Sequence, residues 1–236
     1  MPKLSDWQTY ATNRKGEIVV WINQTDALKG TDSDGVCNAI TRDWITSFDS
    51  IRARAQFYQK FRRVDASGQF LAYSLPDDYV RRQKQLEAEN KVRQVCLTWL
   101  RKTAAAYETK HVGDNSWSER VFGIEPRLIG GPNCQDVIPI DTRKEIIDHL
   151  DLMKGSSYAG ILHLLKDSGG HAVAVEYLPG KEGTKDDYVY QFLDPNTGWF
   201  AFGDYKGLRE FIWYEVLKYY PAPKYNRFKI YNYRME

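Results

Sequence analysis

The 236-residue sequence has no long hydrophobic run and carries almost no net charge. No apolar stretch reaches the roughly 18 residues that a membrane-spanning helix needs, so we expect no transmembrane segment. The 33 basic and 31 acidic residues give a net charge of +2, which provides no argument for binding nucleic acid or an anionic membrane. The first residues, MPKLSDWQTYATNRKGE, lack the apolar core of a signal peptide, so no cleavable leader is expected.

Cysteine is also scarce. The three cysteines, Cys37, Cys96 and Cys134, are too few and too irregularly spaced for a disulfide framework or a zinc site. We therefore expect no metal and no cofactor, and we expect a protein that is made in a reducing cytoplasm. Aromatic residues, in contrast, make up 14% of the chain, which favours β-structure and aromatic-lined grooves.

The apolar pattern along the chain predicts an α+β protein, with helices first and an antiparallel sheet afterwards. Runs of β-branched and aromatic residues, separated by Gly, Pro and Asp turns, mark the strands. The predicted helices are 36–48, 51–64, 78–109, 143–153 and 204–219. The predicted strands are 16–23, 157–167, 170–178, 187–195, 198–203 and 227–233.

Cys37 lies at the start of a predicted helix, in GVCNAITRDW, directly after the turn-rich loop LKGTDSDG. Ser33 or Asp34 is placed to cap that helix. The partial positive charge of a helix N-terminus lowers a cysteine pKa and favours the reactive thiolate. Cys96 falls on the apolar stripe of a helix and Cys134 in a Gly-Pro-Asn loop, so we interpret the first as a core residue and the second as incidental.

A base for this thiol has to come from the four histidines. His111 opens a loop, His149 lies on a polar helix, and His163 lies within a strand. His171 opens the apolar strand HAVAV, directly after the flexible pair Gly169–Gly170. A histidine at the end of a strand can face a cleft while its strand stays rigid. His171 is therefore the first candidate, and His163 is the second.

Asp194 is the candidate that orients this histidine. It ends the next strand, in FLDPNTG, where Pro195 stops the strand ladder. If the strands 171–177 and 188–194 form an antiparallel hairpin, the start of the first lies beside the end of the second. The carboxylate of Asp194 then comes within hydrogen-bond reach of the His171 imidazole, as a Cys-His-Asp triad requires.

The three motifs GVCNAITRDW, GGHAVAV and FLDPNTGWF, in this order, resemble those of the YopT-type cysteine proteases, bacterial effector enzymes of the papain-like clan. The resemblance covers about residues 30–203. It implies that Cys37 is the nucleophile, that His171 is the general base and acid, and that Asp194 orients His171.

The resemblance also implies a papain-like fold. Residues 1–236 would form a single catalytic domain, with a mainly helical part at about 30–150 and a mainly β part at about 155–236. The active-site cleft is expected between the two parts.

The oxyanion site departs from the papain-like pattern. Such enzymes place an amide side chain a few residues before the cysteine, but residues 31–34 read TDSD. The backbone N–H of Cys37 supplies one donor. The candidates for the second donor are Asn23, Gln24, a hydroxyl group, a backbone N–H of the loop, and Asp32 if its carboxyl holds a proton.

By resemblance the protein is an endopeptidase that cleaves a specific protein of a target cell. It would be a bacterial effector or toxin, made in the bacterial cytoplasm and delivered without a cleavable signal peptide. The expected partner is its protein substrate, with a cognate inhibitor or chaperone as a further candidate. Deamidases, transglutaminases and acyltransferases are alternatives, because the same triad forms the same thioester in all of them. A catalytically inactive papain-like binding module is a further alternative, against which the intact Cys, His and Asp argue.

Overall fold

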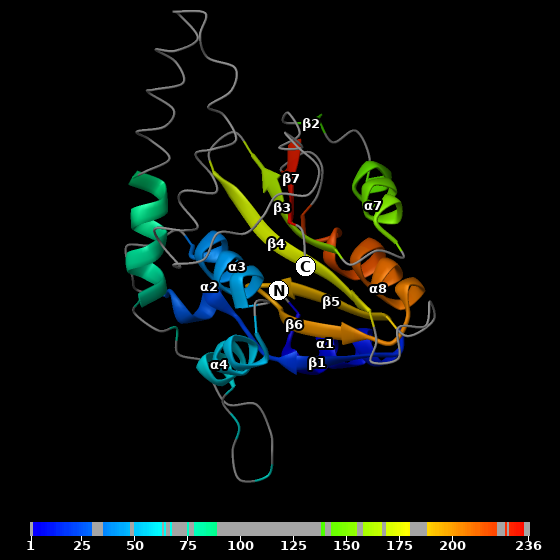
Figure 1. Ribbon diagram of the computed structural model, residues 1–236, viewed down its shortest axis with the longest axis horizontal. Coiled ribbons are helices and arrows are strands. Elements are labelled where there is room, and N and C mark those ends of the chain that lie inside the picture. Colours follow the sequence, from blue (N-terminus) through cyan, green and yellow to red (C-terminus); the bar gives the residue numbers. More distant parts are fainter. Residues whose placement is uncertain are drawn as a thin grey trace, which may run out of the picture.

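The computed structural model describes most of the chain outside one long central segment. The described residues are 2–29, 35–47, 50–62, 64, 67, 75, 78–88, 138–139, 143–154, 158–166, 169–179, 188–220, 225 and 227–233. Within them, one antiparallel sheet lies between two groups of helices (Figure 1). The predicted α+β class is confirmed.

The sheet has the strand order β1-β6-β5-β4-β3-β7-β2, and the neighbouring strands pair antiparallel. The four strands β3 to β6 follow one another closely in the second half of the chain, while β1 comes from the N-terminal part and closes one edge by pairing with β6. The strands are β1 (Gly16–Val20), β2 (Ile138–Pro139), β3 (Tyr158–Leu165), β4 (Gly170–Pro179), β5 (Tyr188–Asp194), β6 (Gly198–Phe202) and β7 (Arg227–Tyr233).

All five predicted helices have described counterparts, with differences at their ends, and of the helix predicted over 78–109 the residues 89–109 lie outside the described part of the chain. The described helices are α1 (Leu4–Thr12), α2 (Gln24–Ala27), α3 (Cys37–Thr46), α4 (Ile51–Phe61), helix 78–88, α7 (Arg143–Leu152), α8 (Tyr205–Phe211) and the π-helix Ile212–Val216. Helices α1 and α2 were not predicted from the sequence. In the described ranges, no helix combines the length and the apolar character needed to cross a membrane.

The helix predicted over 204–219 is two elements. Its α-helical part starts after Asp204, whose carboxylate accepts a hydrogen bond of 2.7 Å from the N–H of Gly207. It ends at Phe211 and continues as a π-helix. Inserted π-turns of this kind rotate the side chains that follow them relative to a regular helix.

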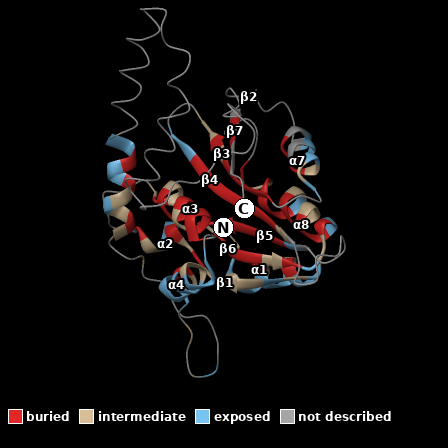
Figure 2. Cartoon of the chain, in the orientation of Figure 1, coloured by how far each residue is buried: buried red, intermediate tan, exposed pale blue. Residues whose placement is uncertain are grey.

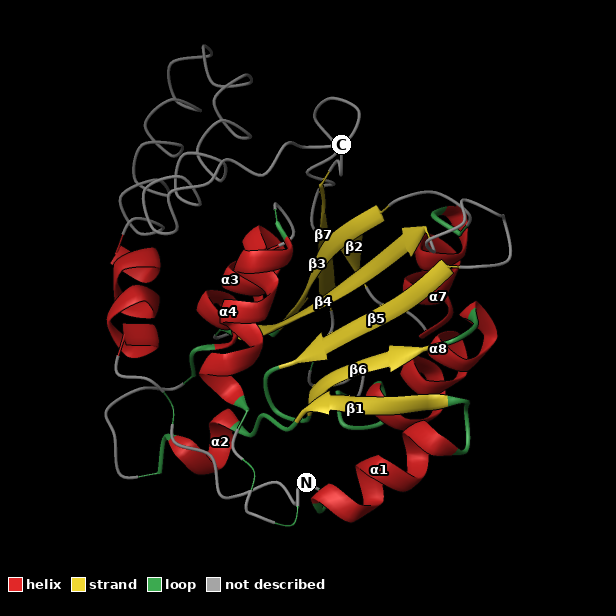
Figure 3. Ribbon diagram, turned by 60° about the horizontal axis from the view of Figure 1, so that its bottom comes forward, coloured by secondary structure: helices red, strands yellow, loops and turns green. Residues whose placement is uncertain are grey.

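Each face of the sheet is covered by its own group of helices, so that the strands are buried on both sides (Figure 2). Helices α3 and α4 pack on one face, with helix 78–88 against their outer side, and α1, α7 and α8 pack on the other face (Figure 3). The side chains of β4 alternate between the two faces, as a strand buried on both sides requires. Ala172 and Ala174 face α3, and Val173 and Val175 face α8.

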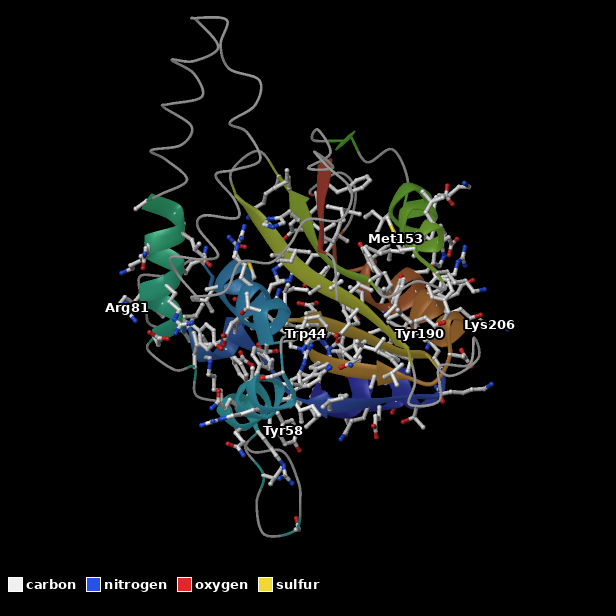
Figure 4. All side chains as sticks on the ribbon, viewed as in Figure 1. Trp44, Tyr58, Arg81, Met153, Tyr190 and Lys206 are labelled. Atoms are coloured by element: carbon white, nitrogen blue, oxygen red, sulfur yellow. The ribbon has the colours of Figure 1, made fainter. Side chains whose placement is uncertain are left out.

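Trp44 anchors α3 to the sheet (Figure 4). Its ring packs edge-on against Trp199 of β6, with 6.0 Å between the ring centroids. The guanidinium group of Arg54, from α4, lies over both rings and donates hydrogen bonds of 3.2 and 3.3 Å to the buried carboxylate of Glu176 on β4. Burial raises the pKa of Glu176, and the Arg54 charge counteracts part of that shift. These contacts fix α3 and α4 on the sheet.

A tight turn at residues 195–197 reverses the chain between β5 and β6. Gly198, at its end, has a φ of +123°, which side-chain-bearing residues rarely adopt. A Cβ atom at this position would lie 2.7 Å from the carbonyl oxygen of Val20, closer than real contacts allow. Gly203, at the other end of β6, has no heavy atom within 4 Å of the corresponding Cβ position.

We expect Gly198→Ala to destabilise the protein by about 2 kcal/mol, because the substitution adds backbone strain and a steric clash. For a chain of this size the melting temperature should fall by about 4–8 °C. Gly203→Ala is the matched control and should change the melting temperature little or raise it slightly. Equal melting temperatures for the two variants, measured by circular dichroism, would contradict the assigned role of Gly198.

Candidate active site

Cys37 is the first residue of α3, and its side chain is half-buried. The first N–H groups of a helix have no partner within the helix and attract negative charge. The N-cap residue is Val36, whose side chain makes no capping hydrogen bond. The prediction that Ser33 or Asp34 is the N-cap residue is therefore wrong. Residues 33 and 34 themselves lie outside the described part of the chain. The Val36 N–H instead donates a hydrogen bond of 2.8 Å to Oε1 of Gln24.

His171 lies near the start of β4, beside the N-terminal end of α3. The Thr41 hydroxyl lies 2.6 Å from the carbonyl oxygen of Cys37 and 3.2 Å from that of Ala172, so helix and strand are joined at this point. The thiol belongs to the face of the sheet that α3 covers, whereas His171 points to the opposite face and stacks on Tyr220. The two side chains meet around the end of the strand, close enough for each to shift the pKa of the other.

Asp194 ends β5 and is fully buried. Its Oδ1 lies 2.8 Å from Nε2 of His171. The predicted antiparallel pairing of the two strands is present, and it brings the start of β4 beside the end of β5. The backbone N–H of Asn196 also donates to Oδ1, at 2.8 Å, and the Tyr220 hydroxyl donates to Oδ2 at 2.8 Å. With Nε2 engaged by Asp194, Nδ1 is the imidazole nitrogen left for the Cys37 thiol.

The electrostatics of this arrangement favour a thiolate and an imidazolium. Burial alone would raise the pKa of Cys37, but the hydrogen bond and charge of His171, with backbone hydrogen bonds, lower it below its ordinary value. Burial alone would lower the pKa of His171. The charge and hydrogen bond of Asp194, together with those of Cys37, outweigh burial and raise the pKa of His171 to about 10. A thiolate beside a protonated imidazole is the reactive form of a thiol nucleophile.

The other histidines and cysteines lie elsewhere or outside the described residues. His163, the second candidate for the base, is on β3 and pairs in register with Ala172. His149 is on α7, which packs on the α8 face of the sheet. His111, Cys96 and Cys134 lie outside the described residues. Among the described residues, no cluster of three or more His, Cys, Asp or Glu side chains could hold a metal ion.

The three oxyanion candidates are in different surroundings. Asn23 caps α2 and donates to the Asp26 carboxylate at 2.7 Å. Gln24 is buried, and its amide lies between the start of α3 and the β5–β6 turn. Its Nε2 donates to Oδ1 of Asn196 at 2.9 Å. Asp32 lies outside the described residues. Gln24 is therefore the candidate whose amide contacts the helix that begins with Cys37.

Two residues beside the site were not predicted from the sequence, Tyr220 and Asn196. Asn196 carries a weak signal, because it stands two residues after Asp194 within the turn sequence DPNTG. Tyr220 carries none, because it is one of 16 tyrosines and lies 26 positions from Asp194.

Comparisons with known proteins give low similarities. Among solved structures, the Pseudomonas avirulence protein AvrPphB matches with a TM-score of 0.48 and 12% identity, over 99% of this chain and 100% of that chain. PatoxP, a cysteine protease-like domain of the Photorhabdus asymbiotica toxin PaTox, matches with a TM-score of 0.45 and 12% identity, over 96% of this chain and 57% of that chain. No family model and no curated protein matches the sequence. The site is therefore assigned from this chain's own residues.

We expect Cys37 to react with iodoacetamide at pH values well below about 8.5, the ordinary pKa of a free thiol. Because the pKa of Cys37 is lowered, its thiolate persists until the pH falls through that lowered pKa. His171→Ala removes the imidazolium and should move the inflection to higher pH. Rates measured in a Cys96→Ala/Cys134→Ala background report on Cys37 alone. A single inflection near the free-thiol pKa in the profile of alkylation rate against pH, unchanged in His171→Ala, would contradict the ion pair.

Proposed function

We propose that the chain is a cysteine endopeptidase in which Cys37 is the nucleophile, His171 the general base and acid, and Asp194 the group that orients His171. The observation that carries this proposal is the buried His171–Asp194 contact of 2.8 Å beside a thiol at a helix N-terminus. In this proposal, residues 1–236 act as one papain-like catalytic domain.

In the first half of the reaction, the Cys37 thiolate attacks the carbonyl carbon of the scissile peptide bond. The tetrahedral intermediate collapses as His171 gives the proton on Nδ1 to the leaving amine, which leaves a thioester on Cys37. In the second half, His171 takes a proton from water, and the resulting hydroxide attacks the thioester. The acid product leaves, and the thiolate–imidazolium pair is restored. Asp194 keeps Nε2 protonated and the ring in place throughout.

The negative charge that develops on the carbonyl oxygen needs donors fixed near Cys37. The backbone N–H of Cys37, at the first helical position, is one of them. Gln24 is the proposed second donor. Its Nε2 carries two hydrogens, one of which is donated to Asn196, and its buried amide already contacts the start of α3. Asn23 is less suitable, because its amide hydrogen bonds belong to the cap of α2.

The biological role follows from the resemblance of the three sequence motifs to YopT-type enzymes. On that basis the protein acts as an effector or toxin that is made in a bacterial cytoplasm, secreted and delivered into a target cell, where it cleaves a specific protein. Hydrolysis, deamidation and acyl transfer share the thioester and differ in the group that resolves it. The reaction product therefore distinguishes the endopeptidase from the alternative activities.

Replacing any member of the proposed triad should abolish turnover while the fold is retained. We expect Cys37→Ala, His171→Ala and Asp194→Ala each to lower kcat by about 10³-fold or more, with non-additive losses when they are combined. Circular dichroism should show folded protein in each case. Cys96→Ala and Cys134→Ala are the matched controls and should keep full turnover. Activity of Cys37→Ala equal to that of the wild type would refute the assignment.

The substrate can be found by comparing target cells that express the wild type with cells that express Cys37→Ala. An endopeptidase should produce new protein N-termini that are present only with the wild type, detected by mass spectrometry of N-terminal peptides. Glutamine mass increases of about one unit without new termini would indicate deamidation instead. Neither product, together with a thiol that iodoacetamide does not label at low pH, would favour an inactive binding module.

A further inference from the structure

We propose that Tyr220 and Asn196 are positioning residues, which hold Asp194 against His171 and connect that pair to Gln24 at the start of α3. The inference rests on the proposed function, because it assigns roles within the same site. It adds two residues to the proposed Cys-His-Asp triad: Asn196, which stands within the FLDPNTGWF motif, and Tyr220, which lies outside the three motifs.

Tyr220 contacts both members of the buried ion pair. Its ring stacks on the His171 imidazole, with 4.8 Å between the centroids and 14° between the planes. Its hydroxyl donates a hydrogen bond of 2.8 Å to Oδ2 of Asp194. One buried side chain therefore restrains the plane of the imidazole and the rotation of the carboxylate together. Oδ2 of Asp194 accepts from the Tyr220 hydroxyl, and Oδ1 accepts from the Asn196 N–H and contacts His171. Rotation of the carboxylate would therefore break at least one of these bonds.

Asn196 fixes the direction of the Tyr220 hydrogen bond. Its Nδ2 donates to the Tyr220 hydroxyl oxygen at 3.1 Å, so the hydroxyl proton is directed to Asp194. On its other side, Oδ1 accepts hydrogen bonds from Nε2 of Gln24 at 2.9 Å and from the Thr25 hydroxyl at 3.1 Å. Both ends of the Asn196 amide are thereby satisfied in one orientation.

These contacts form a continuous chain of hydrogen bonds around the site. It runs from the Val36 N–H through Gln24, Asn196, Tyr220 and Asp194 to His171. The chain connects the N-terminus of α3 to the start of β4 by a second route, in addition to the contact between thiol and imidazole.

The placement of Tyr220 depends on the C-terminal elements. Tyr220 follows the π-helix Ile212–Val216, and its neighbour Tyr219 packs on Trp7 of α1, with 5.5 Å between the ring centroids. The two consecutive tyrosines therefore make separate contacts, one with the core and one with the site. Tyr219→Phe is a matched control for Tyr220→Phe, because each removes one hydroxyl and keeps the ring.

The reactivity of Cys37 toward iodoacetamide reports on this role without a substrate. The described titratable groups around His171 are Cys37 from α3, Asp194 from β5, and Tyr220 and Tyr225 from the C-terminal segment. In Tyr220→Phe the ring still stacks, but the carboxylate loses the donor to Oδ2 and the ion pair weakens. The thiolate is then stabilised less, so the acid limb of the alkylation profile moves to higher pH.

We expect that shift to be about one pH unit, because a hydrogen bond to a charged group is worth roughly tenfold in an equilibrium constant. Asn196→Ala, which keeps the backbone N–H bond to Asp194, should shift the limb in the same direction. The double variant should shift it by less than the sum of the two single shifts, since both act through one chain of hydrogen bonds. Tyr219→Phe should leave the profile unchanged. All variants are measured in the Cys96→Ala/Cys134→Ala background.

An unchanged or downward-shifted acid limb in Tyr220→Phe, with the protein folded by circular dichroism, would overturn the inference and leave the proposed function standing. If Tyr220→Phe is unfolded at the assay temperature, an unchanged or downward-shifted acid limb in Asn196→Ala would overturn the inference instead. A wild-type profile with only the inflection of an ordinary thiol would instead remove the proposed function. The two failures are therefore distinguishable.

Discussion

The buried contact between His171 and Asp194 is the interaction on which the rest of the site depends. A carboxylate removed from water is costly unless it is paired and hydrogen-bonded, and an imidazolium removed from water is costly for the same reason. At 2.8 Å each group compensates the other. The positive charge that this pairing maintains on His171 then stabilises negative charge on Cys37. The lowered pKa of Cys37 thus depends on the His171–Asp194 pair.

The position of the site at the ends of two strands has a geometric cause. Helix α3 covers one face of the sheet, while His171 and Asp194 point to the other. In the middle of a sheet, the backbone would separate side chains on opposite faces. At the start of β4 and the end of β5 the sheet stops, so a thiol from one layer reaches an imidazole from the other. The turn at residues 195–197 closes this end and supplies further hydrogen bonds.

Gln24 shows how an amide can reach the site without standing in the usual place in the sequence. It precedes Val36 by 12 positions, and the sequence between them includes the TDSD stretch. Its main-chain N–H also donates to the carbonyl oxygen of Pro195, at 2.9 Å. The β5–β6 turn therefore holds both the backbone and the side chain of Gln24. In this way the turn that follows Asp194 also positions the proposed oxyanion donor.

The features that depend on local patterns could be predicted from the amino-acid sequence. Cys37 at the start of a helix, His171 at the start of a strand, and Asp194 at the end of the next strand follow from hydrophobic periodicity and turn residues. Neighbouring strands joined by a short connection pair antiparallel, so the proximity of His171 and Asp194 was predictable as well. The α+β class follows from the same patterns.

The distant side chains that complete the site could be identified only from the folded structure. Tyr220 meets Asp194 across 26 positions, and Gln24 meets Asn196 across 172, where no periodicity relates the partners. The preference for Gln24 over Asn23 also depends on this contact, because the two residues are adjacent and chemically alike. Helix α1, which the sequence pattern did not reveal, is fixed by Trp7 packing on Phe211 and Tyr219. Contacts of this kind arise from the packing of layers, which local sequence does not encode.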